Sequence, residues 1–221
     1  MNLSKFDLIN EVFFAEEVTP LQLDFLLAEG WRHFGQHFFR YNVGFYKNGL
    51  RYVMPLRVRT ADFVLSGSQK RVVRKNKDTK CIIRPVEFDD VKHELFRVHA
   101  ERFTHGKPEN LYSFLDEKAA TVPCCTYEFC VFVEDRLAAV SYLDIGDKSV
   151  SSIYAMFDPV HSKRSLGIYT MLLELQYAQE QDKEFYYQGY AYEGESFYDY
   201  KKRLAATEVY DWHGRWEDMK P

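Results

Sequence analysis

Three β-rich runs joined by short turns, with a long amphipathic helix soon after the third, constrain the fold of this chain more than any other feature. The runs span residues 127–134, 137–145 and 149–157, and the turns contain Glu134-Asp135-Arg136 and Gly146-Asp147. Strands joined by turns this short pair side by side as an antiparallel meander. The next helix, expected over residues 165–181, has apolar residues at 166, 169, 172, 173 and 177, the spacing of a helix face that packs on a sheet.

The remaining sequence predicts helices and strands on both sides of this meander. Thr19 can cap a helix, Pro20 suits its first turn and Gln22 completes a capping box. That helix should end near Gly30. Asn48-Gly49 predicts a hairpin between β-rich runs at residues 37–46 and 50–59. Further helices are expected over residues 69–76, 87–103 and 110–120, and further strands over residues 81–86 and 184–190.

The order of elements from residue 87 onward is helix, helix, meander, helix and strand, which predicts an α+β fold. We expect residues 1–86 to form an N-terminal region, with the hairpin and a basic helix, packed on a second domain over residues 87–221. The segment from residue 196 is aromatic and expected to be partly helical. A chain of 221 residues suffices for one large domain or for two small ones with a shared core.

Composition excludes several classes of protein. The net charge is −4 and the pI about 6.0, so the chain as a whole is no polybasic nucleic-acid binder, and any RNA contact must come from a local patch. DNA is not an expected partner. No apolar run approaches the roughly 20 residues that span a bilayer, and residues 1–7 lack the features of a signal peptide, so we expect a cytoplasmic protein without membrane contact. The four cysteines form neither a Cys-x-x-Cys pair nor a disulfide framework, and no metal site is expected.

A candidate anion site lies at the start of the long helix. Arg164-Ser165-Leu166-Gly167-Ile168-Tyr169 follows Asp158-Pro159 and places an arginine, a glycine and free backbone N–H groups at a helix N-terminus. Such an N-terminus binds an anion or stabilises a developing oxyanion, and Arg164 could pair with a phosphate. The alternative is structural: Arg164 and Ser165 only cap the helix, Gly167 only allows packing and Asp158 only forms a turn.

A second candidate site is the most basic part of an otherwise acidic chain. Its cations are Arg57, Arg59, Lys70, Arg71, Arg74, Lys75 and Lys77, opposed by Asp62. On a helix, Arg71, Arg74 and Lys75 share one face, which could hold the phosphates of an RNA or another anion. The alternative is an ordinary solvated helix face.

Aromatic residues gather around the last core strands. They are Tyr154, Tyr187, Tyr190, Tyr198 and Tyr200, accompanied by Gln188. These side chains could stack on a nucleic-acid base and form hydrogen bonds to a bound ligand. The alternative is an aromatic core whose buried hydroxyls are satisfied within the protein.

With these blocks in this order, the chain resembles the arginyl/leucyl-tRNA–protein transferases, which add an amino acid from a charged tRNA to protein N-termini. The matching blocks are Gly30-Trp31-Arg32-His33-Phe34-Gly35 with Phe38-Phe39-Arg40, Pro55-Leu56-Arg57-Val58-Arg59 with Phe63, residues 66–76, Asp158-Pro159, residues 164–169, Tyr186-Tyr187-Gln188-Gly189-Tyr190 and Tyr200-Lys201. The resemblance implies a GNAT-like acyltransferase core, a mixed and largely antiparallel sheet flanked by helices. Arg164 and Gly167 match the donor loop of that fold. Tyr169 stands where a small residue would admit a pyrophosphate, which argues against coenzyme A.

The resemblance also implies the chemistry and the residues that perform it. A protein α-amine attacks the aminoacyl ester at the 3′ end of the tRNA, and aminoacyl-tRNA is a co-substrate that needs no cofactor or metal. Catalytic roles fall on Tyr154, Asp158 and Gln188. Roles in binding aminoacyl-tRNA fall on Arg164, Ser165, Leu166, Gly167, Tyr169, Tyr187, Tyr190, Tyr200 and Lys201. Roles in binding the acceptor or tRNA phosphates fall on Ser68, Gln69, Arg71, Arg74, Lys75 and Asn76.

The implied activity is transfer of Arg or Leu to an acidic protein N-terminus, which marks the protein for degradation under the N-end rule. Two alternatives remain: an N-acyltransferase that uses acyl-coenzyme A, and a non-catalytic relative that binds tRNA or N-termini. The chain departs from the family pattern in three places. Residues 42–54 lack the family's cysteines, Gln188 replaces a commonly apolar residue, and Ala205-Ala206 replaces an Arg-Pro pair. Regulation through those cysteines is therefore not expected here.

Overall fold

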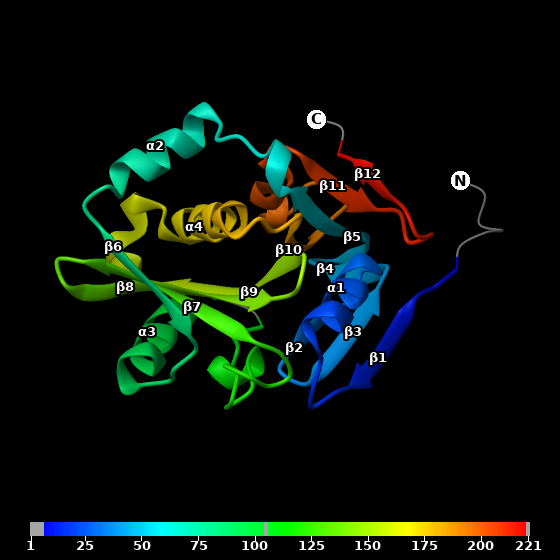
Figure 1. Ribbon diagram of the computed structural model, residues 1–221, viewed down its shortest axis with the longest axis horizontal. Coiled ribbons are helices and arrows are strands. Elements are labelled where there is room, and N and C mark those ends of the chain that lie inside the picture. The colour runs from blue at the N-terminus through cyan, green and yellow to red at the C-terminus, as the bar shows by residue number, and fades with distance from the viewer. Residues whose placement is uncertain (1–6, 104–105, 220–221) are drawn as a thin grey trace.

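A large mixed sheet with helices on both faces forms the body of the protein (Figure 1). The structure, a computed structural model, describes residues 7–103 and 106–219, so most of the N-terminal segment considered for a signal peptide, residues 1–6, lies outside the described residues. The strand order of the sheet is β12-β11-β5-β10-β9-β8-β7-β6, and β4 pairs with the outer half of β5. β9 and β10 run parallel, whereas the other neighbours in this order are antiparallel. The mixed, largely antiparallel sheet of the expected α+β fold is thus confirmed.

The strands of this sheet are β4 (Val43–Tyr46), β5 (Gly49–Arg59), β6 (Lys80–Pro85), β7 (Thr126–Val133), β8 (Arg136–Ile145), β9 (Ser149–Phe157), β10 (Phe185–Tyr192), β11 (Thr207–Tyr210) and β12 (Trp216–Asp218). A separate small sheet has the order β1-β3-β2 and consists of β1 (Asn10–Phe14), β2 (Arg32–Phe34) and β3 (His37–Tyr41). The helices are α1 (Pro20–Ala28), α2 (Gly67–Lys75), α3 (Asp90–Ala100) and α4 (Leu166–Glu180). No helix among the described residues is both long and apolar enough to cross a membrane.

The predicted meander and its covering helix are confirmed as β7, β8, β9 and α4. Side chains of β8 alternate between the two faces of the sheet, as a strand dictates. Val140 and Tyr142 pack with residues of α3, whereas Ala139 and Leu143 pack with residues of α4. Figure 1 accordingly shows α3 on one side of the sheet and α4, with α2 outside it, on the other. The core therefore has two apolar layers, one on each side of the strands that carry the candidate site.

Capping explains where two of the predicted helices begin. Thr19 and Ser66 each form a complete capping box, with Gln22 and Gln69 respectively, at the starts of α1 and α2. The predicted hairpin is present as β4 and β5, but its turn differs from the prediction. Tyr46 pairs with Gly49, so the connecting residues are Lys47 and Asn48, and Lys47 adopts a φ of 51°.

The helix predicted over residues 110–120 was wrong. Only a short 3-10 turn, Leu111–Ser113, forms there. Asp116 disrupts the remainder, because its carboxylate accepts hydrogen bonds from the backbone N–H of Lys118 and from Gln36, both at 2.8 Å. Side-chain bonds of this kind compete with the helical pattern. The segment instead packs against the β2–β3 turn, where Gly35 N–H donates to Phe114 O.

The chain's two expected regions share one sheet. β5 lies between β10 and β11, and β6 lies beside β7 at one edge. Strands from residues 1–86 are therefore hydrogen-bonded on both sides of the C-terminal strands. This arrangement brings the small N-terminal sheet against the place where β9 and β10 meet.

Candidate active site

The parallel strands β9 and β10 separate after a short paired stretch. Their register covers only Ser149–Ser151 against Phe185–Tyr187. Beyond it, each strand carries one extra residue relative to its antiparallel neighbour: Ile153 on β9 against β8, and Gln188 on β10 against β5. Such bulges bend a strand and increase its twist. The two strands diverge at these bulges and leave a split in the middle of the sheet.

Arg32 of β2 reaches into this split. Its Nη1 donates to Ser151 Oγ and its Nη2 to the carbonyl oxygen of Ser152, the residue of β9 that follows the last pair with β10. The residue is only 8% exposed, and burial lowers the pKa of its guanidinium from the ordinary value. Tyr190 of β10 donates to Gly30 O at 2.6 Å, so the segment before Arg32 is fastened to the other side of the split. Arg32 thus donates hydrogen bonds to β9 at the point where β9 no longer pairs with β10.

Lys201 approaches the same place from the 3-10 segment Phe197–Arg203. A Cβ atom built on Gly189 would lie 3.1 Å from Lys201 Nζ and 3.6 Å from Arg32 Nη2. Gly189 has a φ of +86°, in the region that favours glycine. Lys201 Nζ donates to Tyr190 O at 3.3 Å. Burial, reinforced by the charge of Arg32, lowers the pKa of Lys201 to about 7. Two desolvated cations therefore lie together over a glycine at the bulge.

A buried carboxyl group lies nearby on α4. Glu174 is fully buried and accepts a hydrogen bond from the Tyr186 hydroxyl at 2.7 Å, and burial raises its pKa to about 7. Its Oε1 has no hydrogen-bond partner among the described residues, and neither polar atom of the Gln188 amide has one. Buried polar groups normally have partners. In a binding site, such polar groups form their hydrogen bonds with the substrate, and we expect the same at this split in the sheet.

The start of α4 lies at the open end of the split. The part of β9 that does not pair with β10 ends at Phe157. A Cβ atom built on Gly167 would lie 3.4 Å from the Phe157 ring. Ser165 is the N-cap residue, with a φ of 58°, and its side chain makes no capping bond. The Ser165 side chain therefore does not cap the first N–H groups of α4. Because Gly167 has no side chain, a ligand can approach these N–H groups closely. The anion site at this helix start stays a prediction.

Arg164 does not point freely to solvent. Its Nη1 and Nη2 form a two-bond ion pair with Asp78, each at 2.8 Å, and Nη1 also donates to Lys75 O. This pair lowers the pKa of Asp78 to about 2. The sequence identified Arg164 as a phosphate ligand, and Asp78 was missed. In the structure Arg164 holds the end of α2 against the start of α4.

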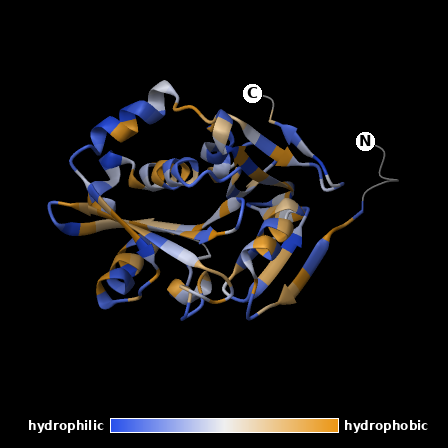
Figure 2. Cartoon of the chain, viewed as in Figure 1, coloured by the Kyte–Doolittle hydropathy of each residue, from blue (hydrophilic) through white to orange (hydrophobic). Residues whose placement is uncertain are grey.

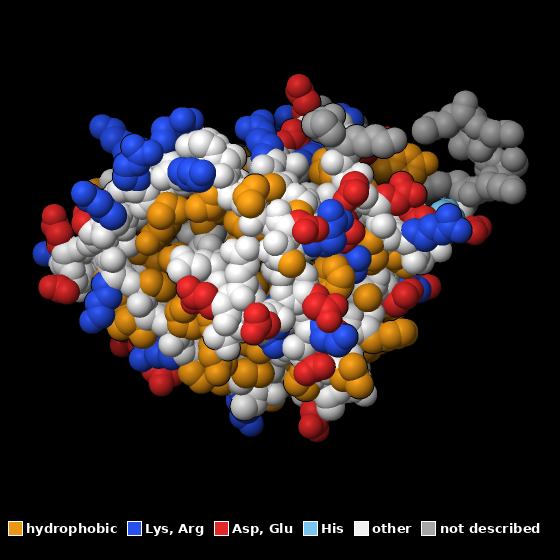
Figure 3. All heavy atoms as spheres, turned by 45° about the horizontal axis from the view of Figure 1, so that its top comes forward, with side chains coloured by type: hydrophobic (Ala, Val, Ile, Leu, Met, Phe, Trp, Pro, Cys, Tyr) orange, Lys and Arg blue, Asp and Glu red, His pale blue; other side chains and the backbone are white. Residues whose placement is uncertain are grey.

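The basic helix α2 converges with this helix start, as the tRNA hypothesis requires. Lys75 Nζ donates to Lys163 O, and Asn76 Nδ2 donates to Arg164 O. Figure 3 shows Lys and Arg side chains gathered over α2 above an apolar hollow, and Figure 2 shows the helix as mostly hydrophilic. Its exposed polar and charged residues are Ser68, Lys70, Arg71, Arg74 and Lys75. Gln69 and Asn76 need correction as phosphate ligands, because Gln69 forms the capping box and Asn76 is fully buried.

Several residues predicted to act in catalysis or in binding aminoacyl-tRNA have structural contacts. Tyr154 stacks on Phe114 at 4.0 Å on the α3 face, and its buried hydroxyl has no partner among the described residues. Asp158 caps the backbone N–H of Val160. Tyr169 is buried and accepts from Thr79. Leu166 at the start of α4 and Tyr187, which accepts from Arg57, are also buried, and the partly buried Tyr200 packs with the α4 layer.

The structure thus unites Gln188, Tyr190 and Lys201 from the predicted set with two residues that received no role. Arg32 lay within a block that resembles the family, and only its 119-residue separation from Ser151 concealed its partner. Glu174 carried a clearer signal. It belongs to the series Leu166, Thr170, Glu174 and Ala178, which repeats every four residues along one buried helix face. A carboxylate in such a series marks a buried polar site.

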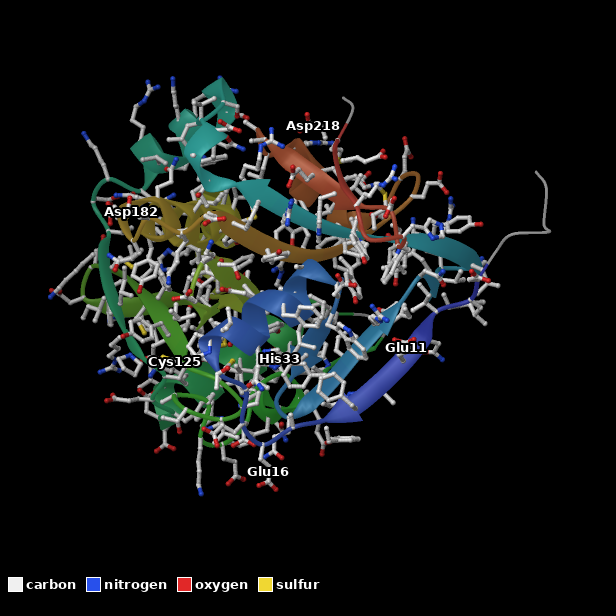
Figure 4. The ribbon with its side chains drawn as sticks, turned by 45° about the vertical axis from the view of Figure 1, so that its right-hand side comes forward. Glu11, Glu16, His33, Cys125, Asp182 and Asp218 are labelled. Atoms are coloured by element: carbon white, nitrogen blue, oxygen red, sulfur yellow. The ribbon has the colours of Figure 1, made fainter. Side chains whose placement is uncertain are left out.

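A second buried polar cluster ties the small sheet to the large one. His33 Nδ1 donates to Gly35 O, and Nε2 lies 2.8 Å from Asp144 Oδ2, whose other oxygen accepts from Thr126 at 2.6 Å. Cys124 Sγ is 3.9 Å from His33 Nε2. Figure 4 labels His33 and Cys125, the residue that follows Cys124 in the chain. The ligand atoms of His33, Cys124 and Asp144 lie within 4.8 Å of one another, close enough for a metal ion, but both ring nitrogens are already engaged within the protein. We therefore interpret the cluster as a structural link.

Comparisons with solved structures agree with the fold. The C-terminal domain of a putative lysylphosphatidylglycerol synthetase from Agrobacterium fabrum superposes with a TM-score of 0.51 at 14% identity, covering 95% of this chain and 66% of that one. FemX gives a TM-score of 0.50 at 12% identity, covering 83% and 66%. At such low identity these likenesses concern the fold alone, and they agree with a GNAT-like core.

Comparisons of sequence identify the family. The aspartate/glutamate leucyltransferase of Campylobacter jejuni (strain RM1221) is 29% identical over 198 residues, which cover 83% of this chain and 77% of the relative. That of Hahella chejuensis is 28% identical over 214 residues, covering 92% and 87%. The sequence pattern described as "Arginine-tRNA-protein transferase, C terminus" matches residues 91–211, more than half of the chain. The chain therefore belongs to the arginine-tRNA-protein transferase family and is an aminoacyltransferase that uses charged tRNA to modify protein N-termini.

Proposed function

We propose that this aminoacyltransferase moves leucine from leucyl-tRNA to the α-amine of proteins that begin with Asp or Glu. The similar proteins from Campylobacter jejuni and Hahella chejuensis are named aspartate/glutamate leucyltransferases. The structural observation that carries the proposal is the split between β9 and β10, where Arg32 and Lys201 lie desolvated beside the unpaired amide of Gln188. A split of this kind can receive the end of a tRNA and the end of a polypeptide from opposite sides.

The donor enters along α2 in this proposal. Exposed Arg71 and Arg74 meet phosphates of the acceptor stem. The 3′ end then reaches the start of α4, whose N–H groups around Leu166 and Gly167 stabilise the oxyanion that forms on the ester carbonyl. Attack forms the new amide bond and expels the 3′ oxygen of the tRNA, which takes up a proton released by the amine. The ester is already activated, so the reaction needs positioning rather than further energy input.

Gln188 is the residue we assign to the attacking amine. Its amide lies on the bulge of β10, is 2% exposed and has an unpaired oxygen that can accept from the amine. Tyr154 and Asp158, which the sequence also identified as catalytic, lie against α3 and the backbone of Val160. The proposal therefore places catalysis on β10 and the start of α4. A cytoplasmic location and a role in N-end rule degradation belong to the same proposal.

A single-turnover assay tests this function. Leucyl-tRNA and arginyl-tRNA, separately radiolabelled, are mixed with the full chain and with peptides that begin with Asp, Glu, Lys or Ala. Transfer of leucine to the Asp and Glu peptides is the expected result. Transfer of arginine instead would correct the donor, and label on the Lys peptide would correct the acceptor. No label from either tRNA, with acetylation from acetyl-coenzyme A, would contradict the proposal.

A further inference from the structure

Arg32 and Lys201 lack the counterion that buried cations normally have. Lys92, which is 1% exposed, shows the ordinary solution: it pairs with Glu128 at 3.0 Å and with Asp89 at 3.1 Å. Arg32 is also buried, yet among the described residues no carboxylate oxygen lies within ion-pair distance of its guanidinium or of the Lys201 ammonium. Desolvated charges are costly unless they are paired. The pair of cations is therefore incomplete.

The two cations also retain unused hydrogen-bond donors. Lys201 makes one bond, to Tyr190 O, out of the three that an ammonium can donate. Arg32 uses one N–H of each terminal nitrogen, toward Ser151 and Ser152. Both side chains approach the side of Gly189 that lacks a Cβ, and Lys201 remains partly exposed. A ligand with two acceptor oxygens and one negative charge would complete this arrangement.

Glu174 does not fill that role. Both cations feel its charge, but only at a distance, and one of its oxygens holds the Tyr186 hydroxyl. Burial raises the pKa of Glu174 to about 7, so near neutral pH the carboxyl group is partly protonated. Asp144, the other carboxylate that acts on Arg32, is already bonded to His33 and Thr126. The protein's own acids therefore leave the cations uncompensated.

We propose that Arg32 and Lys201 together bind the side-chain carboxylate of the acceptor's N-terminal Asp or Glu. This inference rests on the proposed function and adds the residues that recognise the acidic acceptor. A tRNA phosphate is the less suitable anion, because the exposed cations of α2 already offer a surface for phosphates. A single carboxylate is compact, and its two oxygens match one Arg donor and one Lys donor. When the carboxylate is bound there, the α-amine of the same acceptor residue lies beside Gln188, which immediately precedes Gly189.

Isosteric peptides and a neutral lysine variant test this assignment. Peptides that begin with Asp or Asn differ in charge but scarcely in shape, and the same holds for Glu and Gln. The ratio of kcat/KM for the Asp and Asn peptides is measured with leucyl-tRNA for the wild type, for Lys201→Met and for Lys202→Met. Lys202 is the matched control, since it bonds to Gly194 O and Asp199. We expect K201M to lower the Asp/Asn ratio by about 10-fold or more, and K202M to keep it.

Direct binding of fluorescent peptides, measured by anisotropy without tRNA, separates this inference from the proposed function. Tighter binding of the Asp peptide that K201M abolishes supports the carboxylate site, even if leucine transfer fails. An equal fall of transfer to both peptides in K201M, or an unchanged ratio, would overturn the assignment. So would wild-type transfer and binding that ignore the charge of the first residue. Arg32→Lys gives a second check. The variant keeps the positive charge but loses the guanidinium group, whose two terminal nitrogens can bond to Ser151 and to a ligand at the same time.

Discussion

Gly189 lies so close to Lys201 that a Cβ atom on Gly189 would be 3.1 Å from the Lys201 ammonium. Two separate constraints therefore favour glycine at this position: the close approach of Lys201, and a φ of +86°, which other residues rarely adopt. Few positions in the chain combine these two constraints. The combination allows the effect of crowding to be separated from the effect of backbone strain.

Gly189→Ala should lower transfer strongly, whereas Gly214→Ala should not. Gly214 has a similar φ of +93°, but nothing lies within 4 Å of a Cβ built there. Each substitution costs roughly 1–2 kcal/mol of unfolding free energy through its positive φ. Only G189A pushes Lys201 away from Arg32. Transfer kinetics of the two variants, compared at equal folded concentration, check this, and equal activities would show that crowding at Gly189 is unimportant.

Gln188→Leu should stabilise the protein while it impairs transfer. The amide of Gln188 is buried and has no partner in residues 7–103 and 106–219, and replacing it by an apolar group of similar size removes a desolvation cost of about 1–3 kcal/mol. Transfer should fall by roughly 10-fold or more, because the amine loses its acceptor. Urea unfolding and single-turnover kinetics of the same preparation measure both effects. A loss of stability would mean that the amide has a partner inside the protein.

The stability of the protein should depend on pH through Glu174. Its folded-state pKa is raised from 4.5 to about 7, so the folded state binds more protons than the unfolded state between these values. The free energy of unfolding should therefore fall as pH rises from 4.5 to 7, by about 3 kcal/mol from this group. Glu174→Gln should remove that slope. Lys201 acts in another window: its pKa is lowered from 10.5 to about 7, so stability rises from pH 7 to 10.5. E174Q should leave this alkaline rise in place.

Reversal of charge on α2 should weaken tRNA binding. Arg71→Glu with Arg74→Glu should reduce affinity and lower the slope of log K against log salt by about 2, since two phosphate contacts are lost. Lys107→Glu with Lys118→Glu is the control, because both lysines are exposed in the segment that packs with α3 rather than with α2 and α4. Filter binding at several salt concentrations checks this. An equal effect of both pairs would indicate only a response to net charge.

Arg164 should matter through Asp78 rather than through a phosphate. The bidentate pair holds α2 to the start of α4, so Arg164→Ala and Asp78→Ala should lower transfer by similar factors, and the double variant should add little. A direct phosphate ligand would behave differently. In that case Asp78→Ala would release Arg164 and leave tRNA binding equal or tighter.

Much of the fold was predictable, because the decisive signals are local. The capping box at Thr19 indicated the start of α1, and the short turns between three β-rich runs indicated the meander. The second helix was predicted from residue 69, but α2 begins at Gly67, because Ser66 is its capping residue. The helix expected over residues 110–120 failed because Asp116 bonds to Gln36, 80 residues away. Strands β1 and β11 pair with β3 and β5, which lie far from them in the sequence. Strands β2 and β12 are only three residues long, which is too short for a clear alternation.

The site was predictable only in part for the same physical reason. Helix starts and basic faces follow from spacing within a few residues, so the start of α4 and the face of α2 were identified. The pairing of a buried cation depends on which distant strands meet. Neither the approach of Arg32 to Ser151 nor the capture of Arg164 by Asp78 leaves a periodic trace in the sequence.

The position of β5 between β10 and β11 has a consequence for synthesis of the chain. β5 leaves the ribosome more than a hundred residues before either partner, since β10 begins at Phe185 and β11 at Thr207. Until then, only its outer half is covered, by the hairpin with β4. The nascent chain thus carries an open strand with a contiguous backbone edge, a template for unwanted pairing. Arg57 and Arg59 lie on that exposed half, and both later bind Glu208 of β11. The same arginines can therefore keep the waiting strand from aggregating and then fasten the segment that covers it.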